Sequence, residues 1–156
     1  MGSNRTIPAN YPQPLGNQLQ KADAFRQASM LRQEMVTDLL AVLSEAREPG
    51  VRQRLIRLVE SHLKAGMTAA QRAEDLWPTE EEAGQMIAAK PDLKPAAAKK
   101  HLKVFQQWNK VQHRSLELLE SSFENISLIL ARLRPPEPIA ETPKPGVKPL
   151  RTQAGG

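Results

Sequence analysis

The sequence predicts an all-α fold, a helical bundle or hairpin. We expect a long C-terminal helix of about residues 95–134 to pack on a long N-terminal helix of about residues 18–47, with short helices between them. Two observations predict this class. The run 95–134 starts with proline and has no internal Gly or Pro. Strong helix formers dominate the whole chain, and no strand-like alternation of β-branched and aromatic residues interrupts them.

Both ends of the chain are expected to be disordered. Residues 1–17 contain three prolines and no hydrophobic periodicity. Residues 135–156 hold proline at a density that blocks helix and central strand alike, which favours a solvated tail of polyproline II character. The chain therefore divides into a disordered N-terminal arm (1–17), a helical domain (18–134) and a Pro-rich disordered tail (135–156).

The first helix is expected to begin near Asn17, a competent N-cap, and to run to about Arg47. Pro49 and Gly50 then turn the chain, because Pro disfavours helix at the preceding residue and Gly permits a reversal. We expect this helix to pack antiparallel to the last one.

A second helix is expected over residues 51–65, with Gly66 as its stop. Capping boxes at Thr68 and Thr79 predict two short helices before a linker at residues 90–94. These middle helices are expected to lie alongside the long pair.

The last helix carries a heptad seam, and its second half is a candidate surface for a partner or an oligomer. The apolar residues there lie on the seam and also beside it: Leu116, Leu119, Phe123, Ile126, Leu130, Leu133, Leu118, Leu128 and Ile129. Such a seam either grips another helix or packs on the protein's own first helix. From the first alternative we predict a non-catalytic interaction protein that forms homo-oligomers: an adaptor, a chaperone-like protein or an assembly component.

Two consecutive seam positions are polar, Asn109 and Gln112. Buried polar seam residues fix register or oligomeric state. Alternatively this segment is exposed, with Trp108 and Val111 turned toward the core.

A basic face on the first half of the last helix predicts an alternative function, nucleic-acid binding. Residues 94–114 contain six basic side chains and no acidic one, which suits a row of phosphates: Lys94, Lys99, Lys100, Lys103, Lys110 and Arg114. The sequence shows no helix-turn-helix or zinc-finger pattern that would read bases. A solvated charged face is the other interpretation.

Two short motifs lie near the ends. Gly2 stands in a Met-Gly-x-x-x-Thr pattern, which gives a second alternative, a peripheral membrane protein N-myristoylated at Gly2. A chance match is the other interpretation, and we do not expect a membrane partner. A basic-x-x-Pro-x-x-Pro motif begins at Arg132 and is typical of polyproline II ligands, although the tail also suits a solubilising terminus.

Composition excludes several classes of chemistry. The chain has no cysteine, which removes disulfides, thiolate metal sites and thiol nucleophiles. The three histidines stand apart, and no nucleophile elbow or phosphate loop is present. We therefore expect no catalytic residues, no metal and no cofactor. With no apolar run long enough to cross a bilayer and no secretory signal, the expected location is cytoplasmic.

Overall fold

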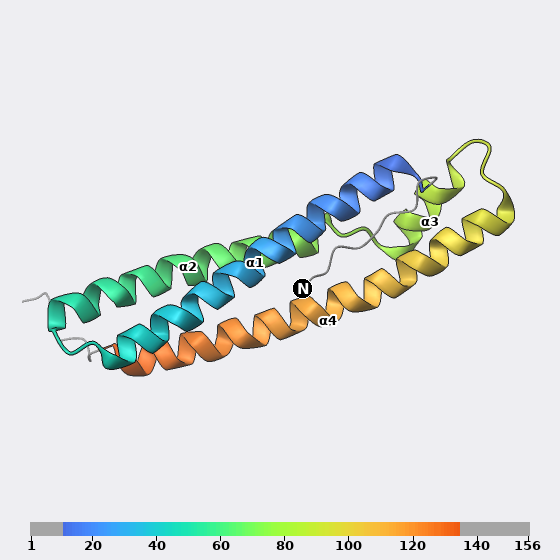
Figure 1. The fold of residues 1–156 in the computed structure, drawn as a ribbon. Coiled ribbons are helices and arrows are strands. Elements are labelled where there is room, and N and C mark those ends of the chain that lie inside the picture. The colour runs from blue at the N-terminus through green and yellow to red at the C-terminus, as the bar shows by residue number, and fades with distance from the viewer. Residues whose placement is uncertain (1–10, 135–156) are drawn as a thin grey trace, which may run out of the picture.

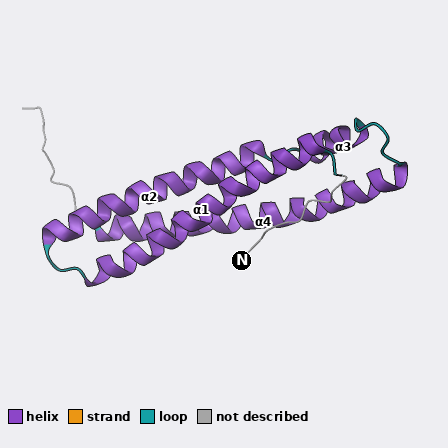
Figure 2. Cartoon of the chain, turned by 45° about the horizontal axis from the view of Figure 1, so that its top comes forward, coloured by secondary structure: helices purple, strands orange, loops and turns teal. Residues whose placement is uncertain are grey.

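The computed structural model describes residues 11–134, which form four helices. These are α1 (Gln13–Glu45), α2 (Pro49–Leu76), α3 (Glu80–Ala88) and α4 (Pro95–Leu133). The three long helices lie side by side, and α3 covers one end of the bundle (Figure 1, Figure 2). No strand occurs in this part of the chain, so the all-α prediction is confirmed.

The long helices run up, down and up. Later residues of α1 pair with earlier residues of α2. Gln18 Nε2 donates to the Leu76 carbonyl (2.7 Å), and Ser29 Oγ donates to the Gly66 carbonyl (2.8 Å). Between α1 and α4 the numbers rise together, because Arg26 bonds Ser115 and Gln33 bonds Ser122. Thus α1 and α2 form the antiparallel hairpin, and α4 is parallel to α1.

The expected antiparallel packing of the first and last helices is therefore wrong, and the cause is the length of α2. It continues through Gly66 and Thr68 instead of dividing there. A single long helix returns the chain to the end where α1 began, so α4 must run in the direction of α1 (Figure 1).

Gly66 lies inside α2, where that helix comes close to both α1 and α4, and it does not end α2. A Cβ on Gly66 would lie 2.8 Å from Phe123 Cζ on α4 and 3.1 Å from Arg32 Cβ on α1. At these distances the Phe123 ring would have to shift to admit a methyl group, so glycine allows the three helices to meet closely at this level.

Proline starts each of the three long helices. Pro14, Pro49 and Pro95 occupy the first turn of α1, α2 and α4, where the missing N–H has no helical partner to lose. Helix α1 consequently begins at Gln13, before the expected start, and residues 11–17 of the predicted disordered arm belong to the fold. Residues 1–10 and 135–156 lie outside the described part of the chain.

Helix α3 begins as its sequence predicts. The Thr79 hydroxyl accepts from the Glu82 N–H (3.0 Å), and the Glu82 carboxylate accepts from the Thr79 N–H (2.9 Å). This capping box satisfies two N–H groups at the helix start that would otherwise lack partners.

Two apolar clusters fill the bundle. The turn-end core lies toward the α1–α2 turn and contains Val36, Leu43, Ile56, Val59, Leu63, Leu119, Phe123, Ile126 and Leu130. The α3-end core lies at the opposite end and contains Tyr11, Leu15, Leu19, Ala83, Ile87 and Phe105. Between them lie the buried polar residues Arg26, Ser29 and Gln112, which we call the polar layer.

Candidate interaction surfaces

The seam of α4 faces the inside of the bundle. Its buried members belong to the turn-end core: Leu119, Phe123, Ile126 and Leu130. Leu116 and Leu133 are half-buried against the same core. In this fold the seam packs on the protein's own helices, as one of the two alternatives for it predicts, and the use of these residues by a partner stays a prediction. The residues beside the seam remain exposed: Leu118, Leu128 and Ile129.

The polar seam positions are buried or bonded within the bundle. The side chain of Gln112 is fully buried, and Asn109 Oδ1 accepts from Trp77 Nε1 (2.8 Å). Val111 is 53% exposed, whereas Trp108 packs on the α3-end core. The interpretation that placed both polar residues outside, with Val111 inside, is therefore wrong.

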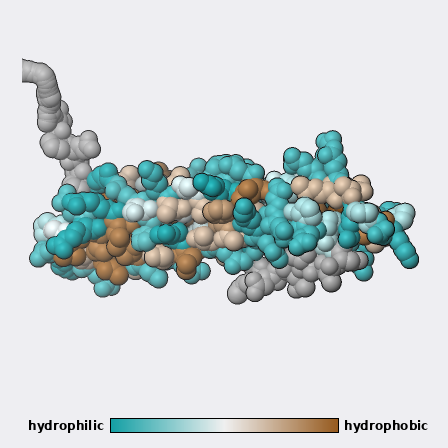
Figure 3. All heavy atoms as spheres, turned by 90° about the horizontal axis from the view of Figure 1, so that it is seen from above, coloured by the Kyte–Doolittle hydropathy of each residue, from teal (hydrophilic) through white to brown (hydrophobic). Residues whose placement is uncertain are grey.

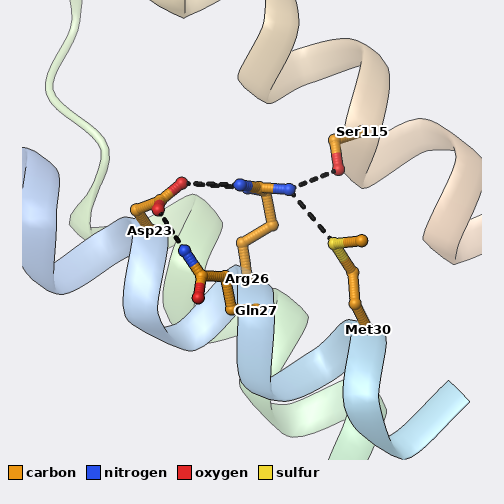
Figure 4. A network of polar contacts seen from close by, with 5 residues as sticks. All are labelled: Asp23, Arg26, Gln27, Met30 and Ser115. Atoms are coloured by element: carbon orange, nitrogen blue, oxygen red, sulfur yellow. Dashed lines mark hydrogen bonds and ion pairs between the residues drawn. The ribbon is translucent and has the colours of Figure 1, made fainter. Parts of the chain in front are cut away.

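The polar layer ties α1 to α4 through Arg26 (Figure 4). The guanidinium donates to Asp23 on its own helix (2.7 and 3.2 Å) and to Ser115 Oγ on α4 (3.1 Å). It also reaches Met30 Sδ (3.1 Å), while Gln27 Nε2 donates to the second Asp23 oxygen (2.7 Å). A buried guanidinium requires such partners, and sliding α4 along α1 would remove the Ser115 bond while leaving the ion pair with Asp23 intact.

A long groove separates α2 from α4. Two adjoining cavities of about 830 and 780 Å³ share Met67, Gln71 and Ser127 as lining residues and together form this groove, which we call the α2–α4 groove. Its α4 wall runs from His113 to Arg134, about 30 Å at 1.5 Å per residue.

The lining of the groove is apolar at its base and partly apolar at its edge. The buried side chains of Leu63, Phe123 and Leu130 line it from the turn-end core. Met67 on α2 and Leu128 on α4 are 51% and 61% exposed. An exposed apolar side chain therefore stands on each side of the groove, one on α2 and one on α4.

Charge is distributed unevenly along the groove. One half is lined by four carboxylates: Glu74, Glu117, Glu120 and Glu124. In the other half Glu60 forms an ion pair with Arg134, and Lys64 lies nearby. The groove is therefore acidic in one half and close to neutral in the other.

The sequence predicts interface residues on the α4 side of this groove and none on its α2 side. Met67 and Gln71 were placed beyond the expected end of the second helix at Gly66, so their alignment with α4 was missed. A helix continued through Gly66 would have put both on one side, since they are four residues apart.

A second apolar region lies on the hairpin side. Seen from above, the surface is mostly hydrophilic, with an apolar cluster toward the end that holds the α1–α2 turn (Figure 3). Exposed apolar residues on α1 and α2 near that turn include Val42 (56%), Val51 (39%) and Leu58 (44%). None of them lines the α2–α4 groove.

The six cations of the predicted basic face are all exposed: Lys94, Lys99, Lys100, Lys103, Lys110 and Arg114. They lie at and after the start of α4, away from the neutral half of the groove. Binding of nucleic acid by this face stays a prediction. Gly2 and the prolines of the tail motif lie outside the described residues.

The histidines do not converge on a site. His62 Nδ1 lies 2.6 Å from an Arg32 nitrogen, and His113 Nδ1 lies 2.8 Å from the Asn109 carbonyl. His101 is buried, and its ring makes a T-shaped contact with the Tyr11 ring. Within residues 11–134, no group of three or more His, Asp or Glu side chains could hold a metal ion.

The environment of Tyr11 shifts its ionisation. Burial raises the pKa of its phenol to about 12, and its hydroxyl lies 3.5 Å from the His101 carbonyl. Ring contacts with His101 and Trp108 complete its surroundings. This residue anchors the start of α1 to α4.

Among the described helices, none combines the length and the apolar character needed to cross a membrane. Comparisons with protein families, curated proteins and solved structures find no match for this chain. A functional hypothesis must accordingly come from the surfaces of the bundle themselves.

Proposed function

We propose that this protein is a non-catalytic interaction protein that binds an amphipathic helix of a partner protein in the α2–α4 groove. The observation that carries the proposal is the groove itself, whose two cavities of about 830 and 780 Å³ open onto the turn-end core. Adaptor, chaperone-like and assembly roles all use such a surface, and the proposal does not depend on which of them applies.

A helix is the occupant that the groove fits best. Its length of about 30 Å matches about 20 helical residues. Three long helices already lie side by side, and a fourth in this position completes a four-helix bundle. The partner's apolar stripe would cover Leu63, Phe123 and Leu130, while Met67 and Leu128 would contact its flanks.

Peptide binding tests the proposal directly. The probe is a synthetic 20-residue amphipathic helix with one leucine stripe and equal numbers of Lys and Glu elsewhere, labelled with fluorescein and followed by anisotropy. A double variant, Met67→Glu with Leu128→Glu, places charges on both edges of the groove. We expect it to weaken binding at least tenfold, because a buried unpaired carboxylate opposes docking.

The matched control is Val42→Glu with Leu58→Glu, which changes two similarly exposed residues outside the groove. Both double variants alter exposed positions, so both should fold, and circular dichroism checks this. We expect the control to bind within twofold of the unmodified protein. Equal losses in both variants, or no binding to the unmodified protein, would reject the groove as the docking site.

A further inference from the structure

We infer that the α2–α4 groove selects a helix whose apolar stripe is flanked by Lys or Arg in one half of its length. This inference rests on the proposed function and names the chemistry of the partner. It comes from the charges along the groove rather than from its apolar base.

The carboxylates in the acidic half of the groove are regularly spaced along α4. Glu117, Glu120 and Glu124 follow one another at spacings of three and four residues, so they lie along one side of α4, and all are exposed. Glu74 lines the same half from α2. Among the described residues, no side chain forms an ion pair with any of these four carboxylates.

Like charges at these spacings repel each other within the free protein. A cation placed between them relieves that repulsion and also gains attraction from each carboxylate. A partner helix with basic residues three and four positions apart along one flank would match the spacing of the α4 edge. The complementarity is therefore one of spacing as well as sign.

The other half of the groove does not favour basic residues on the partner helix. Arg134 already pairs with Glu60 there, and Lys64 adds a further positive charge. Extra cations on the partner would be repelled at this end. The basic residues should therefore be confined to one half of the partner, which fixes the direction in which it lies.

A second copy of this chain is a weaker match. The basic face of α4 has exposed cations such as Lys99, Lys103 and Lys110, but the seam residue near them, Phe105, is fully buried. Val111 lies exposed between Lys110 and Arg114, so this face offers charge with an isolated apolar side chain and not a stripe along its length. A separate partner protein meets both requirements of the groove.

Two synthetic peptides test the inference. They share one leucine stripe, and one carries Lys and the other Glu at the flanking positions of one half. We expect the Lys peptide to bind the full-length protein about tenfold more tightly at low salt, since several rim pairs contribute modestly and together. The protein's net charge of +5 opposes this preference, so the preference must arise locally.

The second part of the experiment uses a variant in which the carboxylates along α4 are neutralised. We expect the triple variant Glu117→Gln, Glu120→Gln and Glu124→Gln, which keeps only Glu74 of the four carboxylates, to reduce the preference from tenfold to less than threefold. The matched control is Glu34→Gln, Asp38→Asn and Glu45→Gln, which removes three exposed carboxylates from α1 outside the groove. This control should keep the tenfold preference for the Lys peptide at low salt. High salt should abolish that preference, because it screens the charges.

The outcomes separate the two proposals. Equal binding of both peptides, abolished by Met67→Glu with Leu128→Glu, would overturn the charge inference and leave the groove as a docking site. Binding of neither peptide would reject both. Light scattering that shows a dimer disrupted by the same double variant would identify a second copy as the occupant and overturn the inference.

Discussion

The two ends of this bundle differ in how completely they are closed. At the α3 end, α3 packs against both α1 and α4, and Trp77 stacks on Phe105 at 5.9 Å between ring centroids. At the turn end, a groove runs between α2 and α4, and buried side chains of the core form its base. The difference is consistent with our proposal that a partner helix docks at the turn end, whereas α3 already covers the opposite end of the bundle.

We expect the largest effect from a substitution in the turn-end core. Phe123→Ala removes a ring that is 2% exposed and packs against Gly66, so we expect a loss of about 3–5 kcal/mol in the free energy of unfolding. Urea denaturation followed by circular dichroism measures it. The control Leu128→Ala, at a residue 61% exposed, should change stability by no more than ~0.5 kcal/mol.

The same variant also tests whether the two ends differ. Both tryptophans, Trp77 and Trp108, pack on the α3-end core, so their fluorescence reports that end alone. We expect Phe123→Ala to lower the urea midpoint seen by circular dichroism more than the midpoint seen by fluorescence. Coincident midpoints would show that the ends unfold as one unit.

A second effect comes from the close approach at Gly66. Gly66→Ala places a methyl group 2.8 Å from Phe123 Cζ, and we expect it to destabilise the protein by about 1–3 kcal/mol. Phe123→Leu removes the clashing ring atoms. In the double variant the cost of Gly66→Ala should therefore shrink by at least half, measured by urea unfolding of all four proteins. If the two changes in the free energy of unfolding are strictly additive, the Phe123 ring is not the reason that position 66 requires glycine.

The smallest expected effect concerns the α3 end and depends on pH. The pKa of Tyr11 is near its model-peptide value of about 10 when unfolded and about 12 when folded, so the folded state holds the proton more tightly. The resulting stability is fully present below pH 10 and is lost progressively as the pH rises toward 12.

Comparison with Tyr11→Phe isolates this contribution, because Phe has no proton to lose while every other group titrates as before. We expect the stability difference between the two proteins to move in favour of Tyr11→Phe as the pH rises from 9 to 11.5. Thermal unfolding over this range measures it. A constant difference would mean that the phenol is not held neutral by burial.

Local signals in the sequence were sufficient for much of the fold. The start of α4 at Pro95 and the capping box at Thr79 depend only on neighbouring residues, and both were predicted. Pro14 and Pro49 act in the same way, yet the N-terminal prolines suggested disorder because Tyr11 and Leu15 gave no periodic pattern on their own. Their burial depends on α4, far away in the sequence.

Gly66 shows why the rest could not be predicted. In sequence it resembles a helix stop, and only the nearness of Phe123 reveals that it is a contact point inside a continuous helix. The direction of α4 and the position of Met67 in the groove both depend on that one interpretation. A groove is set by the distance between helices, which no local pattern encodes.

The polar layer has a consequence for how the protein moves. Regions that share few apolar contacts open separately and with different free energies. Arg26, Ser29 and Gln112 interrupt the apolar contacts between the two cores. We therefore expect amide hydrogens near the turn-end core to exchange with solvent at rates unlike those near the α3-end core. Occupation of the groove should slow exchange at the turn end and leave the far end unchanged.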